Sequence, residues 1–369
     1  MKTEAPDHRI VMTLDAGRTG LKFSAIRGND VLAGPVTRPT EPDDLEKCLH
    51  NITDGFENLR KMLPAAPAAI SFAFPGPADY PRGIINNLKN FKAFEGEVPL
   101  GPILEDRFHI PVFINNDGDL FAYGEAIAGF LPHVNDLLAK AGSPKRYHNL
   151  FGITIGTGFG GGIVHHGELL LGDNSAAGEA WLLRNKIDPS TNAEEGVSIR
   201  AVRRVYAERA GMDLERAPDP KEIFEIGMGQ AEGNRDAAIE AYRQLGEVAG
   251  DALAQALTLV DGLVVVGGGL SSAWPLFLPT LIAAVNGTYG ANGLRLLVPL
   301  VFDLQNPADL ELFLRGDARQ VQVGTSSRMI TFDSMRRTGV GLSRLGTSLA
   351  VAVGARAFAL RQLNKMKEK

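Results

Sequence analysis

The sequence has little cysteine and no long hydrophobic run. Its single cysteine, Cys48, excludes an internal disulfide and any cysteine-rich metal site. The opening MKTEAPDHR does not resemble a signal peptide, and no later run is long enough to span a membrane, so we expect a cytoplasmic protein. The 38 basic and 43 acidic residues give a net charge of −5, which offers no general attraction for nucleic acid or an anionic membrane.

Glycine is the residue present in excess, with 42 among 369 residues, compared with an average usage of roughly 7%. The hydrophobic content of 44% and the charged content of 22% are typical of a soluble globular protein. The length predicts about two domains. Strands alternate with helices along most of the chain, and this predicts an α/β protein with mixed sheets.

Residues 150–164, LFGITIGTGFGGGIV, contain the densest group of these glycines. The pattern predicts a buried strand, a glycine turn and a second strand. A turn without Cβ atoms exposes its backbone N–H groups, and such N–H groups commonly bind phosphate. The turn contains Gly156, Gly158, Gly160, Gly161 and Gly162, with the hydroxyl of Thr157 beside them. The alternative is a structural hairpin without a ligand.

Two other nucleotide motifs do not fit this stretch. The dinucleotide fingerprint G-x-G-x-x-G requires a helix directly after the turn, whereas residues 163–171 have the pattern of a hairpin. The Walker motif requires Gly-Lys followed by Ser or Thr, which is absent here.

A second strand–turn–strand pattern lies near the start of the chain. Residues 10–14 form an apolar run that leads into Asp15, Gly17 and Thr19, and a second strand follows at 23–26. Two such units, about half a chain apart, predict two similar halves facing each other across a cleft. We expect Asp15 on one wall and the glycine turn on the other.

Asp117 follows the predicted strand 111–114 and is our candidate general base. An ionised carboxylate accepts hydrogen bonds only, so it can orient a hydroxyl group and take its proton. The alternative is that Asp117 caps the helix expected near Leu120. Asp119 is the better capping candidate of the two.

The order of these motifs resembles that of the ROK family of sugar kinases. The matching elements are Asp15-x-Gly-x-Thr, Pro75-Gly76-Pro77, the Asn90 loop, Asn116-Asp117, the glycine turn, Gly178-Glu179 and Gly267 to Gly269. The resemblance implies two actin-like (ribonuclease H-like) lobes with mixed sheets. We expect an N-terminal lobe at 1–118 with a closing helix at about 346–369, and a C-terminal lobe at 119–345.

The resemblance also implies ATP-dependent phosphorylation of a hexose or an N-acetylhexosamine, with Mg²⁺. We expect the protein to form a homo-oligomer, namely a dimer. The resemblance implies sugar contacts at Gly76, Asn90, Asn116, Glu179 and, by a looser match, Glu195. It implies nucleotide contacts at Asp15, Gly17, Thr19, Gly156, Thr157, Gly158, Gly160, Gly161, Gly267, Gly268 and Gly269. Asp15 would act through Mg²⁺ and its waters. An unpaired surface charge is an equal alternative for Glu195.

The chain departs from the family in two places. Many members carry a cysteine zinc cluster after the sugar-binding Glu, and this chain lacks those cysteines. We expect no structural zinc, and we expect the apolar run Trp181, Leu182 and Leu183 to hold Glu179 by packing; the rival is a loop that orders only when sugar binds. Residues 303–342 resemble an insertion whose arginines (Arg328, Arg336, Arg337 and Arg344) could form an effector site, a solvated face or a subunit contact.

Two alternatives to a kinase remain. The same family includes sugar-responsive repressors, but the first strand is predicted at Ile10, which leaves no room for a DNA-binding domain. A sugar-binding protein without activity is the other alternative.

Overall fold

Apolar runs in the first part of the chain form a five-stranded sheet with the order β3-β2-β1-β4-β8. The computed structural model describes residues 7–17, 20–28, 30–76, 78–86, 88 and 91–368. The strands are β1 (Val11–Ala16), β2 (Gly20–Arg27), β3 (Asp30–Pro39), β4 (Ala69–Ala73) and β8 (Val112–Asn115). β1 pairs antiparallel with β2 and parallel with β4, and β4 is parallel to β8.

A second sheet has six strands in the order β11-β10-β9-β12-β16-β13. These are β9 (Leu150–Ile155), β10 (Phe159–His165), β11 (Glu168–Leu170), β12 (Leu263–Gly267), β13 (Leu300–Asp303) and β16 (Arg337–Leu342). β9 pairs antiparallel with β10, and β9, β12, β16 and β13 are parallel neighbours. The predicted strand–glycine turn–strand at 150–164 is therefore confirmed.

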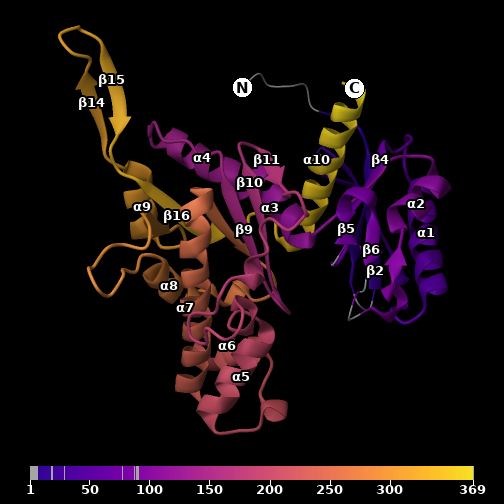
Figure 1. The fold of residues 1–369 in the computed structure, drawn as a ribbon, viewed down its shortest axis with the longest axis horizontal. Coiled ribbons are helices and arrows are strands. Elements are labelled where there is room, and N and C mark those ends of the chain that lie inside the picture. The colour runs from indigo at the N-terminus through magenta and orange to yellow at the C-terminus, as the bar shows by residue number, and fades with distance from the viewer. Residues whose placement is uncertain are drawn as a thin grey trace. The chain divides into compact units, whose positions relative to one another are not determined.

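The chain divides into two units around these sheets, coloured along the chain in Figure 1. Unit 1 contains Met1–Ala128, Leu169–Ala177 and Thr347–Lys369, and unit 2 contains Gly129–Glu168 and Gly178–Gly346. The division falls within β11. In both sheets a meander of three strands continues into two parallel strands, so that β3-β2-β1-β4-β8 has the same order as β11-β10-β9-β12-β16.

Helix α1 (Leu45–Lys61) packs against the sheet of unit 1 through a stripe at helical spacing. Cys48, Ile52, Phe56 and Leu59 are all buried in one cluster with residues of β1 and β2. Burying each large apolar side chain contributes about 1.5–3 kcal/mol. Asp44 caps the helix by accepting a hydrogen bond from the backbone N–H of Lys47 at 3.1 Å.

Helices α3 (Asp117–Ile127) and α10 (Thr347–Lys367) pack unusually closely in unit 1. A Cβ atom at Gly124 of α3 would overlap the backbone oxygen of Ala350, and one at Gly354 of α10 would overlap that of Leu120. The two glycines therefore allow backbone contact between the helices. This contact positions α3, whose first residue is Asp117.

The remaining elements complete the two units. Unit 1 also has α2 (Leu100–Phe108) and a small sheet of β5 (Ala78–Asp79), β6 (Ile84–Asn86) and β7 (Glu97–Val98). The helices of unit 2 are α4 (Phe130–Lys140), α5 (Ile199–Ala210), α6 (Pro220–Gly227), α7 (Arg235–Val260), α8 (Trp274–Val285) and α9 (Pro307–Arg315). A separate hairpin is formed by β14 (Ala318–Gln322) and β15 (Met329–Asp333). The 3₁₀ turns are η1 (Tyr80–Arg82), η2 (Lys92–Phe94), η3 (Ala180–Leu182), η4 (Ala193–Glu195), η5 (Leu214–Arg216) and η6 (Ser271–Ala273).

The sequence pattern did not predict the secondary structure of residues 303–342. In the structure, part of this segment belongs to the six-stranded sheet and part forms a separate hairpin. β16 lies between β12 and β13 in the six-stranded sheet, whereas β14 and β15, among the strands that the structure describes, pair only with each other. Arg337, placed by sequence in a basic cluster, is buried with 2% exposure, so it does not belong to a solvated face. In the part of the chain that the structure describes, no helix is both long and apolar enough to cross a membrane.

Candidate active site

In unit 1, polar groups gather where the parallel strands end. The registers pair Asp15 of β1 with Ala73 of β4, and Ala73 with Asn115 of β8. Asp15 and Asn115 therefore lie in one row across the carboxyl edge of the sheet. Ligands of α/β sheets bind at such edges, because the loops and helix N-termini that follow the strands meet there.

Asn116 and Asp117 follow β8 directly, at the start of α3. The side-chain oxygen of Asn116 accepts a hydrogen bond from the N–H of Gly118 at 2.7 Å, so Asn116 is the N-cap. Asp117 Oδ1 accepts from the same N–H at 2.9 Å. The expectation of Asp117 or Asp119 as the cap is wrong, because α3 begins earlier than Leu120 and Asp119 lies buried in its first turn.

Asp117 is an exposed residue, but the protein around its carboxyl group desolvates that group. Desolvation raises the pKa of Asp117 above its ordinary value, and the negative charge of Asp15 raises it further. The hydrogen bond from Gly118 acts in the opposite direction without cancelling the shift. Asp117 is therefore a stronger base than an ordinary aspartate.

Asn115 is a candidate site residue that the sequence reasoning missed. Its side chain is 1% exposed, and neither its amide nitrogen nor its amide oxygen has a hydrogen-bond partner among the residues that the structure describes. An unsatisfied buried amide costs about 1–3 kcal/mol. A residue kept at that cost, in one row with Asp15, is suited to hold a water or ligand group at the strand ends.

The other predicted residues of unit 1 are only partly accounted for. Gly17 follows β1, and its N–H donates to the carbonyl of Gly20 at 3.0 Å, which closes the turn. Gly76 is exposed in the loop after β4, beside Tyr80, whose hydroxyl donates to the Phe74 carbonyl at 3.0 Å. Thr19 and Asn90 lie outside the described residues.

In unit 2 the structure brings the two predicted glycine segments together. β9 and β12 are parallel neighbours, so the turn after Ile155 and residues 267–269 lie at the same sheet edge. A Cβ on Gly156 would lie 3.9 Å from the nitrogen of Gly269. Gly268 has φ +87° and approaches the backbone of Ile155 too closely for a Cβ, so this position requires glycine. Thr157 is exposed at the turn.

The N-terminus of α5 also meets this turn. The N–H of Ile199 donates to the carbonyl of Gly156 at 2.8 Å, and Ser198 caps the helix. Helix N-termini favour anionic groups, because their N–H groups are not all used within the helix. The start of α5 thus lies beside the glycine turn.

Glu194, which the sequence reasoning passed over in favour of its neighbour, lies against the same turn. Its Oε2 accepts a hydrogen bond from the N–H of Phe159 at 3.1 Å, and a Cβ on Gly158 would lie 2.5 Å from that oxygen. Glu195 instead pairs with the exposed Arg200 at 2.6 Å, and Arg200 also reaches Glu194 at 3.0 Å. The pKa of Arg200 is raised by Glu195 and then by Glu194.

Glu179 lies in a loop that packs on β10. A Cβ on Gly161 would overlap the carbonyl of Gly178, so this loop touches the strand backbone. The indole N–H of Trp181 donates to Oε2 of Glu179. Trp181 and Leu183 pack against the core of unit 2, as expected, whereas Leu182 is 59% exposed, which the packing hypothesis did not anticipate.

The loop after Trp181 is held by its own hydrogen bonds. Oδ1 of Asn185 accepts from the N–H groups of Ile187 and Asp188 at 2.9 and 3.2 Å. Asn192 caps η4 by accepting from the N–H of Glu195 at 3.3 Å. Among the described residues, no group of three or more His, Cys, Asp or Glu side chains is arranged to hold a metal ion.

The sequence model of the ROK family matches residues 11–292 of this chain. The chain therefore belongs to the ROK family. It is 54% identical to a glucokinase from Parabacteroides distasonis, whose crystal structure has a TM-score of 0.89 to this one over 96% of this chain and 98% of that chain.

More distant relatives include two kinases of different sugars. The glucokinase of Streptomyces coelicolor is 27% identical over 294 residues, which are 73% of this chain and 84% of the relative. The N-acetyl-D-glucosamine kinase of Vibrio cholerae is 28% identical over 271 residues, 70% and 83% respectively. A Streptomyces griseus ROK glucokinase, solved with glucose and AMPPNP, is 19% identical, with a TM-score of 0.60 over 94% of this chain and 98% of that chain. The predicted actin-like ATPase fold is confirmed.

The adjacent asparagines should respond oppositely to the same substitution. We expect Asn115→Leu to raise the free energy of unfolding, by up to about 1–3 kcal/mol, because it removes unsatisfied polar atoms without leaving a cavity. Asn116→Leu should lower it by about 0.5–2 kcal/mol, because α3 loses its N-cap. Denaturant unfolding of both variants measures the difference, and a marked loss of stability in Asn115→Leu would show that its amide has a structural partner.

Proposed function

We propose that this chain is a sugar kinase that transfers a phosphoryl group from ATP to a hydroxyl of a hexose or an N-acetylhexosamine. The observation that carries the proposal is the 54% identity to a glucokinase over nearly the whole of both chains. Relatives named as glucokinase and as N-acetyl-D-glucosamine kinase support the same class. The comparisons confirm the enzyme class predicted from the sequence.

Asp117 is the proposed general base. Phosphoryl transfer depends mainly on positioning and charge stabilisation, and the base orients the attacking hydroxyl and accepts its proton. The raised pKa of Asp117 increases its affinity for that proton. Its position at the first residue of α3, held by α10, gives the carboxylate a rigid support.

Sugar contacts are proposed for Gly76, Asn90, Asn116 and Glu179, as the sequence resemblance implies. We add Glu194 as the acid of its segment in place of Glu195. The reason is geometric: the Glu194 carboxylate lies on the glycine turn, whereas Glu195 is turned to Arg200. Carboxylate and amide groups match the donors and acceptors of sugar hydroxyls.

The nucleotide is proposed to bind at the glycine segments. Residues 156–161 and 267–269 would hold it, and the sequence resemblance adds Gly17 and Thr19. The exposed carboxylate of Asp15 fits Mg²⁺, which is commonly held by one or two carboxylates together with waters and substrate phosphates. Bound there, Mg²⁺ would neutralise phosphate charge. The proposed homo-oligomer is the assembly that the resemblance implies.

A coupled ADP-release assay with ATP and Mg²⁺ across glucose, mannose, fructose and N-acetylhexosamines tests this function. We expect turnover of at least one sugar, and a fall in kcat of about 10² to 10⁴ in Asp117→Asn, because the amide cannot accept the proton. The wild-type acid limb should lie above the ordinary aspartate pKa, since a raised pKa means that the base protonates earlier on acidification. Calorimetry should show retained sugar binding in the variant.

Two results would count against this mechanism. Near-normal kcat in Asp117→Asn would remove Asp117 as the base. Sugar binding without turnover by the wild-type protein, over the whole panel, would favour the regulatory or inactive alternative.

Glu194→Gln and Glu195→Gln form a matched pair for the assignment of the sugar-binding acid. The two substitutions are chemically identical and one residue apart. We expect kcat/KM for the sugar to fall at least about tenfold in Glu194→Gln and to change little in Glu195→Gln, because exposed ion pairs contribute about 0–1 kcal/mol. Steady-state kinetics with the sugar as varied substrate decide, and the reverse order of effects would restore Glu195.

Trp181→Phe separates hydrogen bonding from packing at Glu179. Phenylalanine keeps most of the apolar contact but lacks the indole N–H. A hydrogen bond to a charged group contributes about 1.5–3 kcal/mol, so we expect KM for the sugar to rise about tenfold with little change in kcat. Trp274→Phe, at the other tryptophan, which packs against the same core, is the control. If KM rose in Trp181→Ala but not in Trp181→Phe, packing alone would hold Glu179.

A further inference from the structure

Three of the chain's seven histidines gather at one place in unit 2. His148 lies two residues before β9, His165 is the last residue of β10, and His166 begins the turn that follows β10. All three residues are exposed. The ring centroids of His148 and His166 are 5.7 Å apart, and those of His165 and His166 are 4.5 Å apart. The proposed kinase chemistry uses none of these imidazoles.

The strand register makes His148 and His166 direct neighbours across the β9–β10 hairpin. The register pairs Leu150 with Val164, and the same antiparallel register continued by two residues places His148 opposite His166. Opposed residues of an antiparallel pair share a face and have Cβ atoms about 4.5–5.5 Å apart. The two rings are accordingly nearly parallel, with 11° between their planes.

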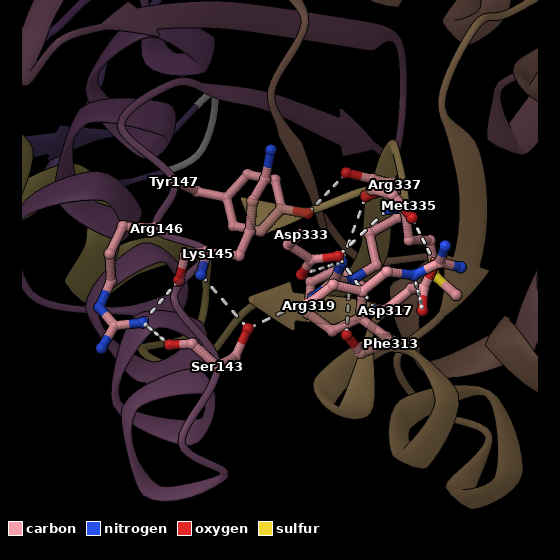
Figure 2. Close-up of polar contacts among 11 residues, drawn as sticks. Ser143, Lys145, Arg146, Tyr147, Phe313, Asp317, Arg319, Asp333, Met335 and Arg337 are labelled. Atoms are coloured by element: carbon pink, nitrogen blue, oxygen red, sulfur yellow. Dashed lines mark hydrogen bonds and ion pairs between the residues drawn. The ribbon is translucent and has the colours of Figure 1, made fainter. Parts of the chain in front are cut away.

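Hydrogen bonds anchor the backbone on both sides of this pair. The hydroxyl of Tyr147, next to His148, donates to the carbonyl of Arg337 at 2.6 Å (Figure 2). On the other side of His148, Oδ1 of Asn149 accepts from the N–H of His166 at 3.1 Å. His166 itself has a φ of +49°, within a tight turn. The two backbone positions are therefore fixed, while the exposed imidazoles can rotate about their side-chain bonds.

The separation of the two rings fits a shared metal ion. A zinc ion lies about 2.0–2.1 Å from an imidazole nitrogen, which places the ring centroid roughly 3 Å from the ion. Two rings at a tetrahedral angle about one ion then have centroids roughly 5 Å apart. The observed 5.7 Å is close to this separation, so small side-chain rotations would direct one nitrogen of each ring at the same ion.

We propose that His148 and His166 bind a divalent transition-metal ion of the nickel, copper or zinc type. Imidazole is a preferred ligand of these ions, whereas Mg²⁺ and Ca²⁺ prefer oxygen. Two imidazoles leave the remaining coordination positions to water, so the site is open. It differs in this respect from a group of three or more His, Cys, Asp or Glu ligands, which the described residues do not contain.

The proposed metal site is separate from the proposed active site. His148 precedes the amino end of β9, whereas the glycine turn follows its carboxyl end at Ile155. The six residues of β9 span roughly 20 Å, at about 3.4 Å per residue. The proposal is therefore independent of the kinase function, and a catalytically inactive chain would still bind the ion.

An ion at this position would join the start of β9 to the end of β10. A ligand that binds the folded chain in preference to the unfolded chain raises stability in proportion to its occupancy. The unfolded chain does not hold His148 beside His166, so it offers no such pair. Metal binding should therefore raise the midpoint of thermal unfolding, which is a readout that does not depend on activity.

Isothermal titration calorimetry of the untagged full chain, first freed of metal with EDTA, tests the proposal with Ni²⁺ as the probe. We expect one ion per chain with micromolar affinity, and no binding of Mg²⁺ at this site. His148→Gln and His166→Gln should each weaken Ni²⁺ binding at least about tenfold, because only one imidazole of the pair remains. His165→Gln, at the adjacent histidine, is the matched control and should bind Ni²⁺ within about twofold of the wild type.

Thermal unfolding with and without Ni²⁺ is the second measurement. Without metal, all three variants should unfold as the wild type does, because the substituted residues are exposed. With Ni²⁺, the midpoint should rise in the wild type and in His165→Gln only. Absence of saturable Ni²⁺ binding by the wild type, or binding that survives both His148→Gln and His166→Gln, would overturn the proposal. An equal loss of binding in His165→Gln would overturn the assignment to the cross-strand pair.

Discussion

In a parallel pair of strands both carboxyl ends lie at one edge of the sheet, and the candidate site depends on this geometry in each unit. In unit 1 the parallel strands β1, β4 and β8 bring Asp15 and Asn115 into one row and deliver Asp117 just beyond it. In unit 2 the parallel pair β9 and β12 brings the glycine turn next to residues 267–269. The two sheets share one strand order, but the edge in unit 1 carries carboxylates, whereas the edge in unit 2 is lined by the backbone of glycine segments.

The two sheet edges differ in how their charged and polar groups are paired. In unit 1, desolvation and a neighbouring negative charge raise the pKa of Asp117, and the amide of Asn115 is buried without a partner among the described residues. In unit 2 the carboxylate of Glu194 accepts a hydrogen bond from a backbone N–H of the glycine turn. Glu194 and Glu195 both form ion pairs with Arg200. The unpaired amide of Asn115 and the raised pKa of Asp117 are local features that do not favour stability, which is typical of functional sites.

Much of this could be predicted from the sequence, because the periodic patterns are local. The stripe of α1 and the apolar run before Gly156 predicted their elements correctly, and the order of motifs predicted the family. The start of α3 was missed because Asn115, Asn116 and Asp117 are consecutive and each is a residue type that can cap a helix. Only the backbone conformation shows which of them is the N-cap. Asn115 was missed because its burial depends on the tertiary structure, which the local sequence pattern does not show. Glu194 and Glu195 are indistinguishable in sequence, and the phase of the short helix η4 decides which one faces the turn.

The long reach of α10 has a consequence for how the protein is made. Unit 1 is discontinuous: its sheet comes from the first part of the chain, and the helix that packs on Val11 and Ala69 comes from the last. Domains generally fold as units during synthesis, in order from the N-terminus. Here the order is reversed, because unit 2 can be completed while unit 1 still lacks a layer. The sheet face that α10 covers can be closed only after residues 347–367 have been synthesised, so the layer that supports α3 and Asp117 is added after unit 2.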